Sequence, residues 1–254
     1  MKTFIYLFIV VFVNTLSAQV NTEKFRKESD KPGYSGSISL AAGLASGNSE
    51  FVKAKGGLRI DYSAPSFDFF LVGNYEFEEA NDAKVVNKGF AHLRNILSLS
   101  PVLSIEFFLQ KEFNQFILLE DRNLGGAGLR VDAINLFADT SVKSVELFFG
   151  TGLMYENEKY NITGSSVTNL FRSTSYLTLN WQMNEIISFI TINYFQFDVE
   201  RFNDFRFINE SGLNFTIFKN LIFTSAISLR YDNEPVPNVR NHDLELTNGI
   251  TFSF

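Results

Sequence analysis

The stretch VELFFGTGLMYE, residues Val145 to Glu156, carries the pattern that decides the fold. One set of alternate positions is almost entirely apolar and comprises Val145, Leu147, Phe149, Thr151, Leu153 and Tyr155. The other set mixes acidic, small and apolar residues and comprises Glu146, Phe148, Gly150, Gly152, Met154 and Glu156. Because successive side chains of a strand point to opposite faces, the stretch predicts a strand with one face suited to lipid and one suited to a crowded polar interior.

The same alternation recurs along the chain. It is clear in LSIEFFLQKEF (103–113), in LIFTSAISLRY (221–231) and in LELTNGITFSF (244–254). Turn residues separate about twelve candidate strands, at 34–46, 51–62, 67–78, 86–99, 103–116, 122–133, 145–156, 170–181, 187–198, 205–217, 221–232 and 243–254. Strands of soluble sheets are usually about 5–6 residues long, whereas tilted membrane strands need about 9–11. The pattern therefore predicts an all-β protein, a transmembrane antiparallel up-and-down barrel.

The connections between these strands alternate in length. SAPS (63–66), SPV (100–102), MNE (183–185) and FKN (218–220) are short, whereas most of the others are longer, polar and acidic. Short periplasmic turns and longer extracellular loops are typical of outer-membrane barrels. Two connections break the pattern, because GNSE (47–50) is short where a loop is expected and INLFADTSVKS (134–144) is long where a turn is expected.

The N-terminal residues have the layout of a secretory signal peptide. Lys2 precedes an apolar run from Phe4 to Val13, and small residues end at Ala18. We therefore expect a cleaved signal at 1–18, a short periplasmic segment at 19–33 and the barrel at 34–254. The chain has no Cys, which excludes a disulfide framework, and its net charge of -6 argues against nucleic acid as a partner.

Aromatic residues and the last strand add to the membrane interpretation. Six aromatic residues fall near the strand ends where interfacial girdles would lie: Tyr34, Tyr62, Tyr75, Tyr155, Trp181 and Tyr231. In a closed barrel the last strand pairs with the first, so we expect the segment that ends in Phe252 and Phe254 to remain ordered. A C-terminal alternating strand that ends in Phe also resembles the signal by which bacterial outer-membrane barrels are recognised by their assembly machinery.

Two stretches of the chain resemble a known family of proteins. SGSISLAAGLASGNSE (35–50) and FFLQKEFNQFILLEDRNLGGAGLR (107–130) resemble the DUF481-like family of bacterial outer-membrane proteins that includes the salt-induced outer-membrane protein. The matching features are the GNS of the first hairpin (47–49) and the pair of strands from QKEFNQF to GGAGLR. The resemblance implies a barrel in the outer membrane of a Gram-negative bacterium. It brings no catalytic residues.

The predicted inward positions collect charges of both signs. We expect a polar network in the lumen that includes Arg59, Arg94, Glu106, Arg130, Glu146, Arg172, Arg206, Glu210, Arg230 and Glu245. Unpaired charges are costly in such an interior, so these side chains are expected to pair with one another and to plug the barrel. The alternative is a narrow conduit in which the excess of Arg and Lys favours small anionic or zwitterionic solutes.

The sequence gives little support to catalysis. His92 and His242 are the only histidines, and neither has a serine in a recognisable nucleophile setting, so an outer-membrane lipid hydrolase is a weak alternative. We expect no catalytic, cofactor-binding or metal-binding residues. A soluble exported barrel that binds a ligand is another alternative, but such a barrel should be apolar inside and polar outside.

Two surface hypotheses complete the sequence interpretation. Acidic loop residues could bind divalent cations near lipopolysaccharide: Glu78, Glu79, Asp82, Glu156, Glu158, Asp198 and Glu200. Lys111, on a lipid-facing position, could reach toward a lipid phosphate. The expected partners are thus outer-membrane lipid, lipopolysaccharide, the assembly machinery and small solutes. The function we expect is a structural or envelope-stress role without catalysis.

Overall fold

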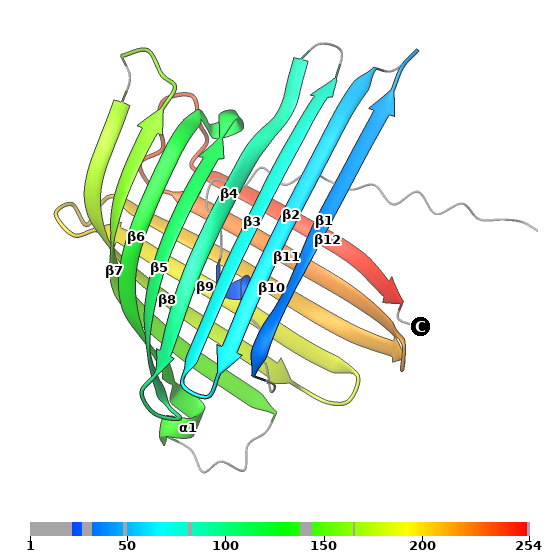
Figure 1. The fold of residues 1–254 in the computed structure, drawn as a ribbon, viewed down its shortest axis with the longest axis vertical. Coiled ribbons are helices and arrows are strands. Elements are labelled where there is room, and N and C mark those ends of the chain that lie inside the picture. The colour runs from blue at the N-terminus through cyan, green and yellow to red at the C-terminus, as the bar shows by residue number, and fades with distance from the viewer. Residues whose placement is uncertain are drawn as a thin grey trace, which may run out of the picture.

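The computed structural model describes residues 22–26, 32–47, 50–80, 83–137, 144–164 and 166–252. Within them, one sheet of twelve strands runs in chain order from β1 to β12 (Figure 1). The strands are β1 (Gly33–Ala45), β2 (Phe51–Ala64), β3 (Phe67–Ala80), β4 (Ala83–Ser98), β5 (Leu103–Asn114), β6 (Leu119–Asp132), β7 (Val145–Tyr160), β8 (Ser166–Gln182), β9 (Ile187–Asp198), β10 (Phe205–Phe218), β11 (Leu221–Asp232) and β12 (His242–Phe252). Every neighbouring pair is antiparallel, which confirms the predicted up-and-down topology.

In the described residues, three short helices accompany the sheet. Helix η1 (Glu23–Phe25) precedes the first strand, η2 (Gln115–Ile117) joins β5 to β6, and α1 (Ala133–Phe137) lies in the long connection between β6 and β7. Among the described residues, no helix is both long and apolar enough to cross a membrane. We call the end of the barrel with the short connections and α1 the turn end, and the opposite end the loop end.

Strand boundaries follow the sequence pattern closely at the turn end and less closely at the loop end. The predicted strands 187–198 and 221–232 coincide with β9 and β11. In contrast, β7 and β8 extend well beyond the predicted limits, to Tyr160 and from Ser166, so most of the polar stretch between them is strand rather than loop. The polar residues here alternate between the two faces of the sheet, and the sequence pattern predicts a loop because the stretch lacks an apolar face.

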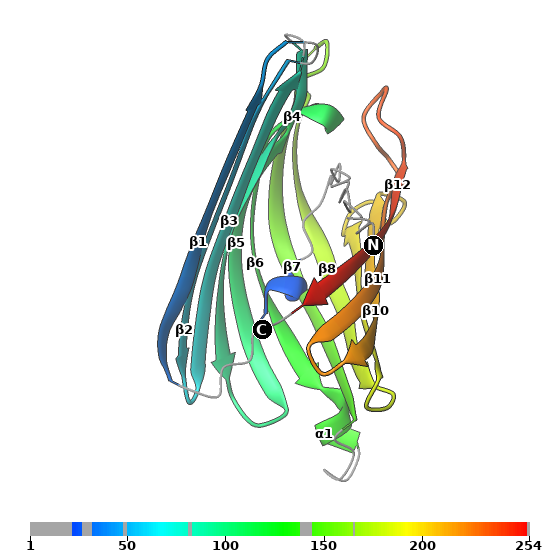
Figure 2. The same ribbon diagram turned by 90° about the vertical axis from the view of Figure 1, so that its right-hand side faces the viewer.

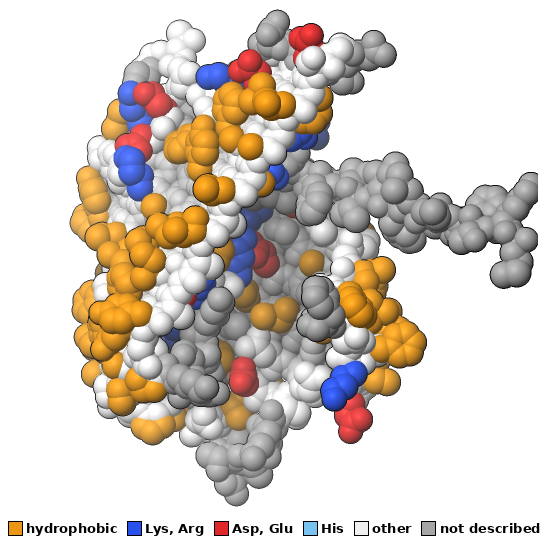
Figure 3. Space-filling view, turned by 45° about the vertical axis from the view of Figure 1, so that its right-hand side comes forward, with side chains coloured by type: hydrophobic (Ala, Val, Ile, Leu, Met, Phe, Trp, Pro, Cys, Tyr) orange, Lys and Arg blue, Asp and Glu red, His pale blue; other side chains and the backbone are white. Residues whose placement is uncertain are grey.

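The two faces of the barrel differ in the way that the alternation predicts. On β5 and β7, the outward side chains of Leu109 and Leu153 are 61% and 57% exposed, whereas the inward Phe148 and Met154 are 6% and 2% exposed. In Figure 3, apolar side chains cover much of the outer wall, and charged side chains gather in the hollow that it encloses. This apolar outer face is the surface that hydrocarbon would accept.

Glycines on β6 and β7 make room for large side chains inside the barrel. A Cβ added at Gly150 would lie 2.1 Å from the ring of Tyr176, and one at Gly126 would lie 2.5 Å from the ring of Phe108. The predicted role of the GGAG segment, relief of crowding in a strand, fits this geometry. Tyr176 can therefore pack with Ile192, Tyr194 and Ile208 as part of a small inner apolar cluster.

The edges of the sheet differ from the prediction. In the strand order of the described residues, β1 pairs only with β2 and β12 only with β11, so the expected pairing of the last strand with the first is not found. The two edge strands lie apart on either side of an opening (Figure 2). Each therefore keeps one row of backbone donors and acceptors unpaired. Apolar side chains on both edges are well exposed, with Leu40 at 84% and Leu246 at 65%.

Candidate functional site

Residues 22–26 lie inside the barrel rather than outside it. The sequence predicts a periplasmic segment at 19–33, but η1 sits in the space enclosed by the sheet (Figure 2), and Thr22 and Glu23 are only 5% and 4% exposed. The ring of Phe25 lies 5.5 Å from that of Phe90 on β4. We call residues 22–26 the inner segment.

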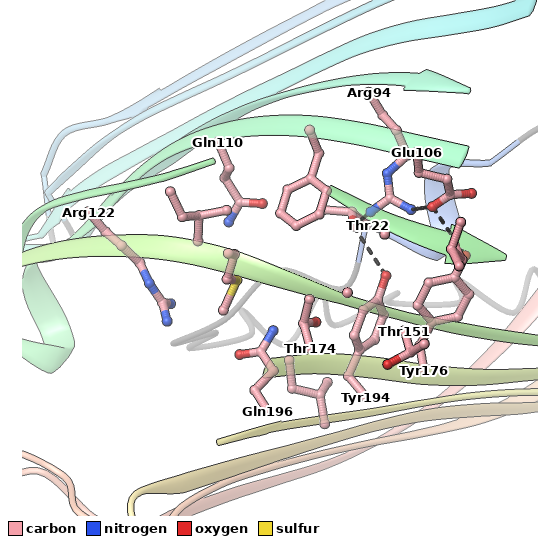
Figure 4. A pocket seen from close by; sticks show the side chains of 17 residues that line it. Thr22, Arg94, Glu106, Gln110, Arg122, Thr151, Thr174, Tyr176, Tyr194 and Gln196 are labelled. Carbon is pink, nitrogen blue, oxygen red and sulfur yellow. Dashed lines mark hydrogen bonds and ion pairs between the residues drawn. The ribbon is translucent and has the colours of Figure 1, made fainter. Parts of the chain in front are cut away.

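Ion pairs and hydrogen bonds fix the inner segment to four strands. Arg94 of β4 donates to Thr22 Oγ1 at 2.6 Å and pairs with both Glu23 and Glu106, the latter at 3.0 Å. Arg26 also pairs with Glu106, from β5. Figure 4 shows Thr22, Arg94 and Glu106 grouped together at the wall of an internal cavity.

The far wall of the barrel contributes further contacts to the inner segment. The hydroxyl of Tyr194, on β9, lies 3.3 Å from Thr22 Oγ1, and Tyr176 of β8 donates to Glu106 at 3.2 Å. Lys24 reaches Glu210 of β10 at 3.3 Å. We call the inner segment together with Arg94, Glu106, Tyr176 and Tyr194 the plug cluster.

Glu23 is the electrostatic centre of the plug cluster. Burial disfavours its charged form, but Arg26 and Arg94 more than offset this and lower the pKa of the Glu23 carboxyl to about 2. Arg26 donates two hydrogen bonds to this carboxylate, both at 2.9 Å. Glu23 is therefore ionised and paired at neutral pH.

A second charged cluster lies nearer the loop end and is built by strands alone. Glu156 on β7 is fully buried and accepts from Arg122 of β6 at 2.7 Å, from Arg172 of β8 at 2.8 Å and from Arg206 of β10 at 3.0 Å. Glu158 pairs with Arg206 and Arg122, each at 3.0 Å. We call this set the loop-side cluster. It crosses the barrel, because its members come from strands on different walls.

The two clusters lie between three cavities of the lumen, and a fourth cavity of about 350 Å³ lies along β9 to β12. Arg122 lines both a small loop-end cavity and a small middle cavity of about 50 Å³, so the loop-side cluster separates these two. Thr22 lines the middle cavity and Arg26 lines a turn-end cavity of about 1250 Å³, so the inner segment separates these two. Figure 4 shows the middle cavity, with Arg122 at one end and Thr22 at the other. The inner segment and the loop-side cluster thus each lie between two of these cavities, and the fourth is lined by Lys24 of the inner segment and by Arg230, which also lines the loop-end cavity.

The ten predicted lumen residues occupy inward positions but do not form one site. Arg94 and Glu106 belong to the plug cluster, and Arg172 and Arg206 to the loop-side cluster. The other six lie outside the two clusters. Arg59 pairs with Asp61, and Glu210 pairs with Arg230 at 3.1 Å. Arg130 and Glu146 line the turn-end cavity, and Glu245 accepts a hydrogen bond from Thr247.

The predicted girdle residues lie on the outward face of the sheet. The rings of Tyr34 and Tyr62 pack against each other at the turn end in a tilted arrangement, with centroids 4.6 Å apart, while Trp181 at the same end is 42% exposed. Tyr75 and Tyr155, each 45% exposed, and Tyr231 lie toward the loop end. Of the predicted assembly signal, Phe252 ends β12 and is 58% exposed, whereas Phe254 and the predicted signal peptide lie outside the described residues.

The hypothesis that acidic loop residues bind divalent cations is wrong for three of those residues, because they are buried and paired. Glu156, Glu158 and Asp198 are 0%, 3% and 3% exposed, and each is paired with arginine inside the barrel or at its rim. Glu156 is the last inward residue of the predicted strand, and the extension of β7 to Tyr160 places Glu158 on the same face. Within the described residues, no group of three or more His, Cys, Asp or Glu side chains is placed to hold a metal ion.

Sequence reasoning missed the inner segment and the inward position of Glu158, which it assigned to a loop. The alternation of β7 could have placed Glu158, because it continues the inward set that ends at Glu156 in the predicted strand. His92, considered above for catalysis, is 1% exposed and lies between Gln110 at 3.1 Å and Arg94 at 3.3 Å. His242 is exposed and contacts Asn241 at 2.8 Å.

The fold and the interior together define a class, an up-and-down antiparallel barrel of twelve strands with a charge-paired lumen. The family described as "Protein of unknown function, DUF481" matches residues 38–254, and the chain belongs to this family. No protein with a curated description matches the sequence.

A comparison with solved structures finds a similar fold. A structure described as "NanC porin structure in rhombohedral crystal form" is 10% identical in sequence, with a TM-score of 0.47. The match covers 87% of this chain and 98% of that one. It adds nothing to the topology already described.

Proposed function

We propose that the protein is an integral outer-membrane barrel whose lumen is closed at two levels, and that its role is structural or related to envelope stress rather than catalytic. The observation that carries the proposal is that paired charges fill the lumen at two levels, where the inner segment and the loop-side cluster each lie between two cavities. A barrel filled by paired charges gains stability and loses its aqueous path.

The membrane location is supported by the outer face and by the length of the strands. The strands run from 11 to 17 residues, enough to cross hydrocarbon at a tilt, since about 9–11 are needed. Large apolar side chains such as Leu109 and Leu153 are exposed on the outer wall, where water would make them costly. The signal-like N-terminus and the girdle aromatics agree with export to the outer membrane.

The non-catalytic role is supported by the settings of the two histidines. His92 is enclosed by Gln110 and Arg94, and His242 is at a rim exposed to solvent. A general base needs a nucleophile within hydrogen-bond reach, and the described contacts of both histidines include none.

Planar-bilayer conductance of the mature protein, refolded and shown by heat-modifiable migration to be folded, tests this proposal. We expect no stable unit conductance. Stable, ion-selective steps from the intact protein would refute the closed lumen and favour a channel.

A second candidate, a gated narrow channel, is favoured by one feature of the inner segment. In the described residues, the contacts of this barrier with the sheet are side-chain ion pairs and hydrogen bonds, and the segment is not itself a strand, so it could leave the lumen without unfolding the sheet. Conductance that is absent in the intact chain but present after deletion of residues 19–31 would support gating. Absence of conductance in both the intact and the shortened chain would favour the structural role.

A further inference from the structure

Four polar side chains form an island in the apolar outer wall of β9 and β10. Thr191 and Asn193 alternate along β9 with Tyr194, which is buried on the inner face, so both point outward. Directly opposite them on β10 lie Ser211 and Asn209, on the same outward face. All four lie in the middle part of their strands. We call these four residues the polar island.

Apolar side chains surround the polar island. The neighbouring outward positions include Leu177 and Leu179 on β8, Phe195 and Phe207 toward the loop end, and Ile227 and Leu229 on β11. Of these, Leu177, Phe195 and Ile227 are 41%, 44% and 40% exposed, so the ring faces away from the lumen. In a membrane barrel, outward positions in the middle of a strand contact hydrocarbon, which offers a polar side chain no hydrogen-bond partner. A group that covers the island must therefore come from protein.

The polar island has hydrogen-bonding capacity beyond its own contacts. Asn209 donates to Asn193 Oδ1 at 2.7 Å and to Thr191 Oγ1 at 3.2 Å. Asn193 and Ser211 also donate to Thr191 Oγ1, at 3.1 and 2.8 Å, so three donors converge on one hydroxyl oxygen. A hydroxyl oxygen accepts at two positions, and these neighbours occupy them. The hydroxyl hydrogen of Thr191 is therefore directed away from its neighbours, toward a group outside the island.

We propose that the polar island is the centre of an interface between two copies of this chain in the membrane. Amide and hydroxyl groups both donate and accept hydrogen bonds, so the same four residues facing one another across a twofold axis are complementary to themselves. The island contains no charged side chain and so requires no partner of opposite charge. The apolar ring supplies the packed surface around it, as polar residues and their apolar surroundings do between membrane helices. The inference goes beyond the proposed function and does not depend on whether the lumen conducts.

Energy transfer between labelled copies tests the inference. The refolded mature protein carries Ser100→Cys, in an exposed turn, and copies with a donor or an acceptor fluorophore are mixed in phosphatidylcholine vesicles. We expect energy transfer that rises with the protein-to-lipid ratio and falls when unlabelled protein is added. Asn209→Leu should weaken the association about tenfold or more, because the island loses the side chain that donates to two of its members. Transfer no greater than random placement produces, or equal association of a folded Asn209→Leu variant, would overturn the inference.

Asn95→Leu is the matched control for this substitution. Asn95 is also an outward asparagine, but it lies on β4 between Phe69 and Phe107, on the wall opposite β10 (Figure 2). We expect this variant to associate like the parent. An equal loss in the Asn95→Leu and Asn209→Leu variants would show that the position of the island does not matter, and would refute the assignment. Heat-modifiable migration shows that each variant is folded.

Cross-linking decides the question even where Asn209→Leu does not fold. The chain has no cysteine, so a single Ser211→Cys substitution places one thiol in the polar island. We expect mild oxidation in the vesicles to link two copies of this variant through a disulfide. The same treatment of Ala91→Cys, an outward position on β4, should leave it monomeric. Equal yields of linked dimer from the two variants, or none from Ser211→Cys, would contradict an interface centred on the island.

Discussion

The plug cluster and the loop-side cluster lie across the same lumen but are built in different ways. Both are built from buried arginines and glutamates, but every member of the loop-side cluster belongs to a strand, whereas the plug cluster depends on a short segment outside the sheet. We therefore expect substitutions in the loop-side cluster to change the stability of the sheet more than substitutions in the inner segment do. The inner segment lies between the middle cavity and the turn-end cavity. Similar chemistry is thus part of the sheet in one cluster and depends on a segment outside the sheet in the other.

Arg206→Met is expected to have the largest effect on the barrel. Arg206 pairs with Glu156 and Glu158 at 3.0 Å and with Asp232 at 2.9 Å, so its loss leaves buried carboxylates poorly compensated. We expect the free energy of unfolding to fall by about 3–5 kcal/mol. Urea unfolding in lipid vesicles, followed by the fluorescence of Trp181, the only tryptophan, measures it.

Arg240→Met is the control for this comparison, because Arg240 is an exposed arginine at the loop end. We expect its free energy of unfolding to match that of the parent. An equal loss in both variants would mean that burial and pairing of Arg206 contribute nothing specific.

Glu23→Gln should affect the barrel less than Arg206→Met. The substitution removes a buried partner of Arg26 and Arg94, but both arginines keep Glu106. We expect a loss of about 1–3 kcal/mol in the same unfolding measurement. A loss as large as that of Arg206→Met would erase the distinction between the two clusters. Lys24→Gln is the matched control, since Lys24 is partly exposed and makes one ion pair, at 3.3 Å.

Acid should release the inner segment while the barrel remains folded. Because the pKa of Glu23 is lowered from 4.5 to about 2 in the folded protein, its stabilising contribution is complete above pH 4.5 and is lost as the pH falls toward 2. The groups that face Glu23 are Arg26, Arg94, Arg130, Glu106, His92, Tyr176 and Tyr194. Cleavage by pepsin near Phe25, compared with cleavage of Glu23→Gln at each pH, measures the release. If pepsin cleaves the two proteins with the same pH dependence, the charge of Glu23 does not hold the inner segment in the barrel.

Lys111→Ala should have the smallest effect. Lys111 lies on the outer wall with its side chain 64% exposed and pairs with Asp121 at 2.6 Å. Exposed pairs contribute little, so we expect a change below about 1 kcal/mol in unfolding free energy. A larger loss confined to vesicles that contain anionic lipid would instead support the hypothesis of a lipid phosphate contact.

Much of the fold follows from the sequence because strand periodicity is a local property. The alternation of residues 145–156 places Phe148 and Met154 inside and Leu153 outside, as the structure has them. The ends of β7 and β8 were predicted less well, since polar residues at the loop end carry no apolar signal. Alternation could also not show that β1 and β12 remain unpaired with each other, because edge pairing depends on the curvature of the whole sheet.

The candidate site was less predictable, for a physical reason. The alternation identifies which charged side chains point into the lumen, but it does not show which of them pair with one another. Arg206 and Glu156, for example, are 50 positions apart in sequence. The inner segment was missed because EKFR (23–26) has the composition of a solvated segment. Its burial becomes evident only when Arg94 and Glu106 are seen to face it.

Thiol labelling of a Thr174→Cys variant tests the central claim, closure at two separate levels, most directly. The chain has no cysteine, and Thr174 lines the middle cavity between the two clusters. With the protein in lipid nanodiscs, we expect a membrane-impermeant maleimide to react with this position far more slowly than with a Ser100→Cys variant in an exposed turn, and deletion of residues 19–31 to raise the rate markedly. Rapid labelling of the intact variant, at the rate of the exposed turn, would contradict the closed lumen.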